Sequence, residues 1–252
     1  MTVLINIAAF TAAWRLTHFY SPDETEDSGK TLFGKKIARH QHHLPDIDFF
    51  EVDTLHGGKF IESWKLDMEP SDGVFLFFHD YTIEEDVLIS RAIETYREGY
   101  TAVVIFFRGF GRSEGDETTL GYAEAEEVEM AMEWCAYQYP GQKIYLVGRG
   151  ISSLSIFRAV AEFDLQPAHI IIESPQYSVR EVVKKLSAGN NLINNWLTSF
   201  WIGNIHGFHL DAFKKFNGEK TPWIDLTSWQ QEGEVRWLNV IDTATYANKY
   251  GG

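Results

Sequence analysis

Apolar residues form short continuous runs along the middle of this chain, and amphipathic segments separate these runs. Such runs predict strands that are buried on both faces, whereas the segments between them carry apolar residues at helical spacing. The expected strands are 73–79, 102–107, 143–148 and 169–173, and the expected helices are 86–98, 120–137 and 152–162. The repeated strand–helix–strand alternation predicts an α/β fold with a mostly parallel central sheet flanked by helices.

The segments before and after this alternation predict further elements of the same domain. Residues 49–55 and 59–66 are expected to be strands joined by the His56-Gly57-Gly58 turn, which gives an antiparallel hairpin at the start of the sheet. Residues 176–215 are helical and aromatic in patches. We expect the last two strands at 222–226 and 235–241.

The first residues form a separate segment. Residues 3–13 are apolar and end at Arg15, so this run is shorter than the roughly 20 residues that span a bilayer. No Lys or Arg precedes the run, which argues against a secretory signal. We expect a helix docked on the domain, with membrane association through residues 3–20 as the less favoured alternative. An acidic loop is expected at 21–30. Residues 1–30 are thus the N-terminal apolar segment with this loop, and residues 31–252 are a single domain.

Composition restricts the possible partners. The chain has 252 residues, of which 44% are hydrophobic, and this is enough to build one buried core. Its net charge of -14, without a basic stripe, excludes nucleic acid as an expected partner. The only cysteine is Cys135, so no intrachain disulfide can form. This fits a reducing compartment, and we expect a cytoplasmic protein that needs no cofactor. The oligomeric state is left open.

Four short motifs follow the expected strands. They are His79-Asp80-Tyr81, the segment FRGFGRSEG at 107–115, the segment LVGRGIS at 146–152 and the segment IESP at 172–175. The chain resembles the α/β-hydrolase superfamily, near the Bem46-like and serine aminopeptidase-like hydrolases, over about residues 45–222. In that family these motifs resemble the oxyanion loop, the RGxGxSxG loop, the nucleophile elbow and the ESP segment. The resemblance implies an α/β-hydrolase fold with a small helical cap at about 176–215.

The nucleophile elbow lacks its nucleophile. Laid on the Gly-x-Ser-x-Gly pattern, Gly148 is the first glycine and Gly150 takes the place of the catalytic serine. Glycine has no hydroxyl that a histidine could deprotonate, so the usual acyl transfer is not expected. Ser152 and Ser153 fall in the first turn of the following helix, where we expect structural roles.

Three further positions of the family pattern also depart from it. Gln230 stands near the expected acid position, and Tyr246 stands near the expected histidine. The sequence contains no histidine after His209. In the oxyanion loop, Asp80 and Thr82 replace small glycines, and a carboxylate there opposes a developing negative charge. These departures indicate a degenerate triad.

The leading hypothesis is therefore a catalytically inactive hydrolase homologue, a pseudoenzyme, that binds a small apolar ligand or a protein partner. The residues expected to bound its residual pocket are His79, Asp80, Tyr81, Arg149, Gly150 and Ile151. One alternative is an esterase or amidase that uses non-standard groups, for example Asp80 with His79 activating water. A structural subunit is the other alternative.

Histidine clusters and a run of aromatics are weaker signals. The HxHH cluster of His40, His42 and His43 and the pair His206 and His209 lack a carboxylate at a helical offset, so we expect no metal site. The aromatic segment Trp196–Phe208 falls where hydrolases carry a cap. It is expected to line a ligand cavity, to seal a vacant one or to form a partner surface.

Overall fold

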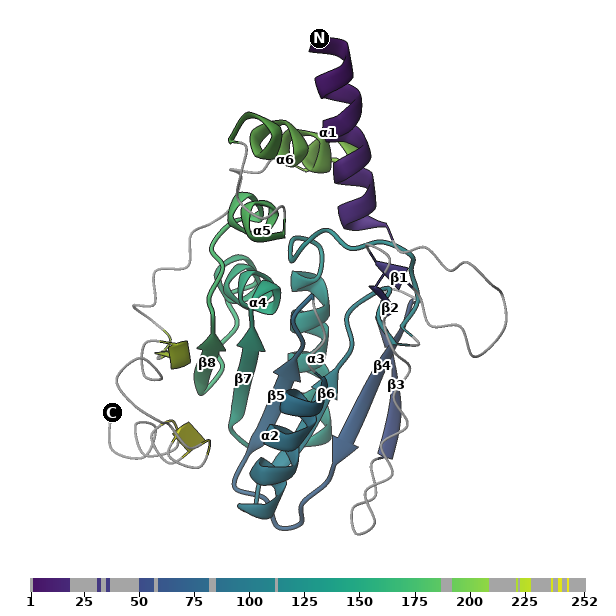
Figure 1. Ribbon diagram of the computed structural model, residues 1–252. Helices are drawn as coiled ribbons and strands as arrows, with labels where there is room; N and C mark the ends of the chain where they lie inside the picture. The colour runs from purple at the N-terminus through teal and green to yellow at the C-terminus, as the bar shows by residue number, and fades with distance from the viewer. Residues whose placement is uncertain are drawn as a thin grey trace.

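The protein folds into a central sheet with helices on both faces, as the computed structural model in Figure 1 shows. The structure describes residues 2–18, 31–32, 35–36, 50–56, 59–81, 85–111, 113–186, 192–208, 221, 223–227, 237, 240–241 and 244. The helices are α1 (Thr2–Thr17), α2 (Glu85–Arg97), α3 (Ala125–Gln138), α4 (Ile151–Glu162), α5 (Val179–Leu186) and α6 (Leu192–His206). In the described part of the chain, none of these helices has the length and apolarity to cross a membrane.

Among the described residues, the main sheet has seven strands in the order β3-β4-β6-β5-β7-β8-β9. Its strands are β3 (Phe50–His56), β4 (Lys59–Leu66), β5 (Val74–Phe78), β6 (Thr101–Ile105), β7 (Ile144–Arg149), β8 (His169–Glu173) and β9 (Trp223–Asp225). A separate short pair consists of β1 (Thr31–Leu32) and β2 (Lys35–Lys36). The hairpin β3–β4 is antiparallel and β4 joins β6 antiparallel, whereas β5 to β9 are parallel to their neighbours. The predicted α/β architecture is confirmed.

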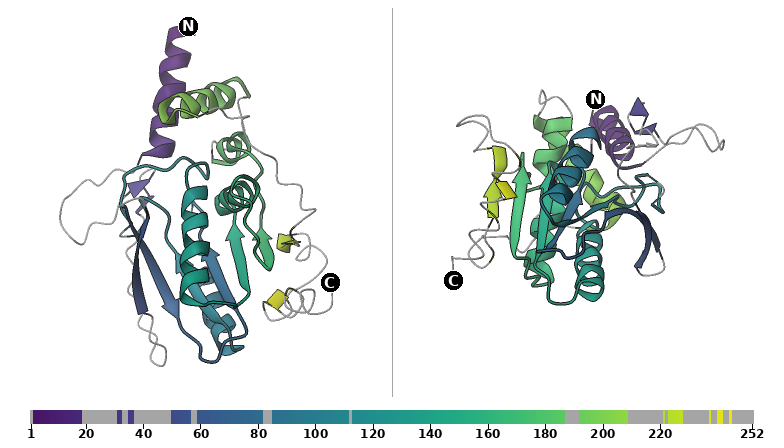
Figure 2. Two further views of the ribbon diagram at one scale, coloured as in Figure 1. Left: turned by 180° about the vertical axis from the view of Figure 1, so that it is seen from behind. Right: turned by 90° about the horizontal axis from the view of Figure 1, so that it is seen from below.

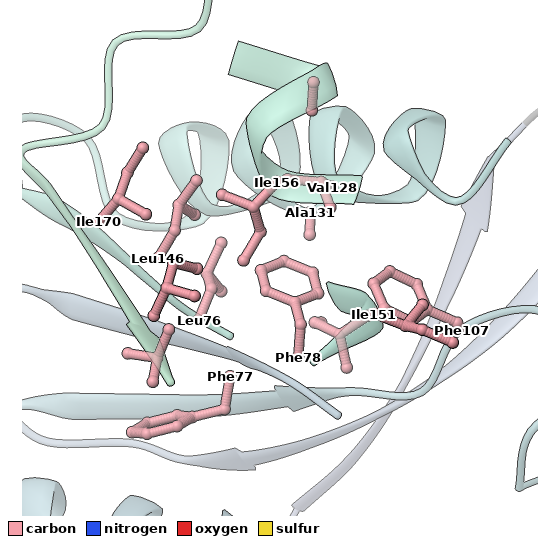
Figure 3. Packing of buried hydrophobic residues seen from close by; sticks show 14 of the residues in the cluster. Leu76, Phe77, Phe78, Phe107, Val128, Ala131, Leu146, Ile151, Ile156 and Ile170 are labelled. Carbon is pink, nitrogen blue, oxygen red and sulfur yellow. The ribbon is translucent and has the colours of Figure 1, made fainter. Parts of the chain in front are cut away.

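The central strands are buried on both faces, which explains their continuous apolar sequences. All residues of β5, β6 and β8 are buried. Successive side chains of a strand point to opposite faces, and in Figure 3 Phe78 points towards Ile156 while Phe77 points to the other side of the sheet. The Phe75 and Tyr145 rings stack across β5 and β7 with centroids 4.4 Å apart. Both faces of the sheet therefore need helices, as the alternation predicted.

Helix α3 begins at Ala125, several residues after the predicted start at 120. Leu120 has φ 57° and Gly121 has φ 97°, so the chain turns here and is not yet helical. The Glu124 carboxylate accepts hydrogen bonds from the amides of Thr119 and Gly121 at 2.9 and 3.0 Å. This local turn competes with the helix, and the apolar periodicity does not reveal it.

The expected strand at 235–241 is wrong where the structure describes it. Trp237, Val240, Ile241 and Ala244 are helical and buried. Trp237 is three and four residues before Val240 and Ile241, and Ala244 follows them at the same intervals. This spacing places all four side chains on one face of a helix, whereas a strand needs apolar residues at every second position. The acidic loop expected at 21–30 lies outside the described residues.

Helix α1 docks on the domain at the end of the molecule that also carries α6 (Figures 1 and 2). Ala9, Ala13 and Leu16 are buried along one side of α1. The ring of Phe10 meets that of Trp201 in α6 edge to face, with centroids 5.3 Å apart. Helices α5 and α6 lie beyond the carboxyl ends of β7 and β8, where a hydrolase cap is expected. In the same region α1 approaches the candidate site.

Candidate functional site

Gly150 keeps the strained backbone of a nucleophile elbow. It lies between β7 and α4 with φ 58° and ψ -118°, a conformation that side-chain-bearing residues adopt only at a cost of about 1–3 kcal/mol. Its N–H donates to the Glu173 carbonyl at 2.9 Å. A Cβ on Gly148 would lie 2.6 Å from Ile156 Cδ1 and 2.8 Å from Ser152 Oγ, so a larger residue there would have to displace these side chains. The turn is therefore built like a serine-hydrolase elbow, without the serine.

The space of the missing side chain is filled by Asp80. A Cβ on Gly150 would lie 2.2, 2.3 and 2.4 Å from Asp80 Oδ1, Cγ and Oδ2. Real Cβ atoms essentially never approach other heavy atoms this closely. A side chain at residue 150 and the present position of the Asp80 carboxylate therefore exclude each other.

The carboxylate of Asp80 also accepts hydrogen bonds from the two amides that correspond to an oxyanion hole. Asp80 Oδ1 accepts hydrogen bonds from the N–H of Tyr81 at 2.8 Å and of Ile151 at 3.0 Å. In α/β-hydrolases the hole consists of the amide after the nucleophile and an amide from the loop after the third strand of the sheet, which are the corresponding positions here. Lys185 Nζ of α5 lies 3.9 Å from Asp80 Oδ2. The chain thus places its own anion at the amino end of α4, where the helix dipole favours it.

Both ring nitrogens of His79 are hydrogen-bonded to the backbone. Its Nδ1 lies 2.8 Å from the Asp80 carbonyl and its Nε2 lies 3.1 Å from the Phe107 nitrogen. Since the carbonyl can only accept and the amide can only donate, Nδ1 carries the proton and Nε2 accepts. Burial lowers the pKa of His79 to about 4. The ring is therefore neutral and has no free nitrogen for a substrate or a water molecule.

Tyr81 connects the oxyanion loop to α1. Its hydroxyl donates to the carbonyl of Leu16, in the last turn of that helix. Burial, with a further contribution from Glu124, raises the pKa of Tyr81 well above its ordinary value. The tyrosine is therefore a neutral donor with a structural partner. Sequence reasoning missed that the N-terminal helix reaches this site.

A small hollow opens beside Asp80 and is lined by His79, Asp80, Val87, Leu88, Arg91, Val147, Gly148 and Arg149. It encloses about 370 Å³ including its open mouth, and its closed part has room for little more than a water molecule. Arg91 Nη1 lies 2.7 Å and Arg149 Nε 3.8 Å from Glu173 Oε2. Arg149 is therefore half-buried beside a carboxylate. The sequence did not predict that Glu173 pairs with Arg91 and Arg149 next to this hollow.

Ser152 and Ser153 have the structural roles expected of them. Both are buried at the start of α4. Ser152 Oγ accepts from the Arg149 amide at 2.7 Å and lies 3.1 Å from the Phe78 carbonyl. Ser153 Oγ accepts from the Gln176 amide at 2.7 Å and donates to the Gly150 carbonyl. Both hydroxyls are therefore bonded to the backbone.

Several sequence-predicted positions cannot be placed. Gln230, Tyr246, His40, His42, His43 and His209 lie outside the described residues. His206 is described, and its Nδ1 lies 3.7 Å from the Glu117 carboxylate, which also lies 3.7 Å from His18 Nε2. Within the described ranges, no group of three or more His, Cys, Asp or Glu side chains is arranged to hold a metal ion.

Comparison with known proteins identifies the fold by structure alone. No protein-family model matches the chain, and no curated protein matches its sequence. One crystal form of an esterase from Pyrococcus furiosus is similar with a TM-score of 0.58 and 17% identity, over 84% of this chain and 97% of the esterase. A second crystal form gives 0.51 and 21%, over 63% of each chain.

A lidless serine hydrolase from Xanthomonas campestris is similar with a TM-score of 0.44 and 21% identity, over 54% of this chain and 64% of the hydrolase. This likeness is too distant to add to the argument. The likeness to the esterase agrees with the strand order, with the hairpin at the start of the sheet and with the elbow at Gly150. This protein has the α/β-hydrolase fold.

Proposed function

We propose that this protein is a non-catalytic member of the hydrolase fold, a pseudoenzyme that acts by binding. The observation that carries the proposal is the position of the Asp80 carboxylate, which fills the nucleophile space at Gly150 and accepts both amides of the oxyanion hole. Ester and amide hydrolysis in this fold requires those amides to be free for a developing oxyanion. The fixed carboxylate removes these donors and adds a repulsive charge at the same point.

The alternative hydrolase, in which Asp80 and His79 activate water, has less support. A general base must come within hydrogen-bond reach of the proton that it removes. Both nitrogens of His79 are bonded to the backbone, and Asp80 Oδ1 already accepts two amides. For His79 to act on water, the oxyanion loop therefore has to rearrange.

Of the two kinds of binding, a protein partner has more support than a small apolar ligand. Ligand sites commonly have volumes of about 300–1,000 Å³ and bury most of their ligand. The closed part of the hollow beside Asp80 has room for little more than a water molecule, far below that range, although Val87, Leu88 and Val147 give it an apolar wall. A small ligand here would be held at the mouth of the hollow.

Absence of turnover is tested with the purified full chain, short-chain acyl esters and a fluorophosphonate probe, with a serine esterase assayed in parallel. We expect neither labelling nor turnover. Gly150→Ser alone and the double variant Asp80→Gly with Gly150→Ser are the matched pair. The double variant frees the space and the two amides, but the sequence contains no histidine after His209, where the family places its base, so it too is expected to be inactive. Labelling of a serine in the natural protein, or turnover lost in His79→Ala, would overturn the proposal.

The two kinds of binding are separated by filling the hollow. Val87 is exposed and lines it, so Val87→Trp closes the mouth without replacing a core residue. Small apolar compounds are screened for an increase in melting temperature of the natural protein and of this variant. An increase that the variant abolishes would assign a ligand to the hollow and count against the protein-partner interpretation.

A further inference from the structure

Helices α1 and α6 carry exposed apolar side chains that no other described element covers. We call this set the apolar cap: Leu4, Ile7, Phe10 and Trp14 of α1, with Trp196 and Phe200 of α6. Leu4 is 71% exposed, Ile7 57% and Trp196 55%. Single exposed apolar residues are ordinary, but six on adjacent helices form a patch that calls for an explanation.

The aromatic members of the apolar cap are connected by ring contacts through Trp201, which is half-buried. The centroids of Phe10 and Trp14 lie 6.3 Å apart, and those of Phe10 and Trp201 lie 5.3 Å apart. Phe200 continues the row at 5.7 Å from Trp201 and 6.0 Å from Trp196. The exposed aromatics of the two helices therefore belong to one surface.

Helix α1 is apolar on two opposite faces. Ala9, Ala13 and Leu16 are buried against the domain. Leu4, Ile7 and Trp14 are exposed and, at 100° per residue, lie on the other side of the helix. A helix that is apolar on one side buries that side when it docks on its domain. A helix that is apolar on both sides still exposes one apolar side after docking, and this side calls for a second apolar environment.

The charge distribution identifies that environment. The chain contains 36 acidic and 22 basic residues, yet Arg15 is the only one of these in α1 and α6 contains none. Of the two helices, α1 therefore carries one positive charge and α6 carries no Lys, Arg, Asp or Glu. The net negative charge of the chain disfavours anionic lipid, whereas these two helices place little charge against neutral headgroups.

We infer that the apolar cap binds the interface of a zwitterionic phospholipid bilayer. Trp and Phe are suited to the boundary between headgroups and acyl chains. The amino end of α1 projects from the molecule past α6 (Figures 1 and 2). Helix α1 has 16 residues and is about 24 Å long, shorter than the hydrocarbon core of about 30 Å, so contact is with one leaflet.

The experiment is flotation of the full chain with phosphatidylcholine vesicles through a density gradient, at low and at high salt. We expect the protein to float with the vesicles and high salt not to release it, because the contact is apolar. The triple variant Leu4→Ser, Ile7→Ser and Trp196→Ser should reduce the bound fraction by about tenfold. The matched control is Tyr137→Ser, which removes a side chain that is 82% exposed on α3 and should bind as the natural protein does.

A second measurement covers the case in which the triple variant does not fold. With vesicles of brominated phosphatidylcholine, tryptophan fluorescence of the natural protein should be quenched, and Trp14→Phe with Trp196→Phe should remove most of the quenching. Failure of the natural protein to float overturns the inference. Lipid-free self-association that the triple variant abolishes also overturns it, because a second copy then covers the cap. None of these outcomes depends on whether the protein hydrolyses esters.

Discussion

The carboxylate of Asp80 occupies the space into which a side chain at Gly150 would project, with Oδ1 2.2 Å from the position of that Cβ. The two residues are far apart in sequence, and the amide of Ile151 joins them by bonding to Asp80 Oδ1 at 3.0 Å. The present position of the Asp80 carboxylate therefore depends on the absence of a side chain at residue 150.

Gly150→Ala should destabilise the protein by the strain of its backbone, about 1–3 kcal/mol, and further by the contact with Asp80. The second contribution should disappear in the double variant with Asp80→Gly, so the two substitutions should be non-additive by about 0.5–3 kcal/mol. Urea unfolding of the four proteins measures this coupling. Gly141→Ala is the control, because Gly141 has φ 81° but nothing within 4 Å of its Cβ position. Additive effects at 80 and 150 would contradict the coupling.

Asp80→Ala should reduce the free energy of unfolding by about 1–3 kcal/mol, because the amides of Tyr81 and Ile151 lose their acceptor. Asp80→Asn keeps an acceptor oxygen at the same place and should cost clearly less. Thermal and urea unfolding compare the two variants. Equal losses would mean that the charge and the contact with Lys185, and not the two amide bonds, account for the stabilisation.

Stability should fall in acid partly because of His79. Burial lowers its pKa to about 4, whereas the unfolded chain binds the proton near 6.5. Between these values the unfolded state binds more protons, so the stabilising contribution is complete above about pH 6.5 and is lost as the pH falls towards 4. Relative to His79→Gln, the natural protein should lose up to about 1.4 kcal/mol per pH unit in this window. Parallel curves for the two proteins, measured by urea unfolding across the window, would refute this.

Tyr81→Phe should loosen α1, because the hydroxyl bonds to the Leu16 carbonyl near the end of that helix. The expected cost is about 1 kcal/mol, with faster hydrogen exchange of the α1 amides. Tyr139→Phe is the control, since its hydroxyl donates to Asp67 Oδ1 at 2.7 Å and does not contact α1. Similar exchange of α1 in both variants would show that Tyr81 does not hold the helix.

The sequence by itself determined the fold class and the place of the elbow. Strand β8 was predicted at 169–173 and found at His169–Glu173, because an apolar run with no polar interruption fits a strand buried on both faces. The Gly-x-Ser-x-Gly spacing, which is local, predicts that Gly150 takes the place of the catalytic serine, and Gly150 does lie in the turn between β7 and α4 with φ 58°. Patterns of this kind depend on neighbours along the chain, so the sequence contains them in full.

Only the tertiary structure decided what fills the elbow. Asp80 was expected to oppose an oxyanion, but its bond to the Ile151 amide depends on how β5 and β7 pair in the sheet. The bond to Nε2 of His79 likewise depends on the neighbouring strand β6 and the Phe107 amide that follows it. The approach of α1 to Tyr81 joins residues 65 apart in sequence. Such contacts arise from packing between distant segments, and hydrophobic periodicity records which face of an element is buried but not which groups it meets.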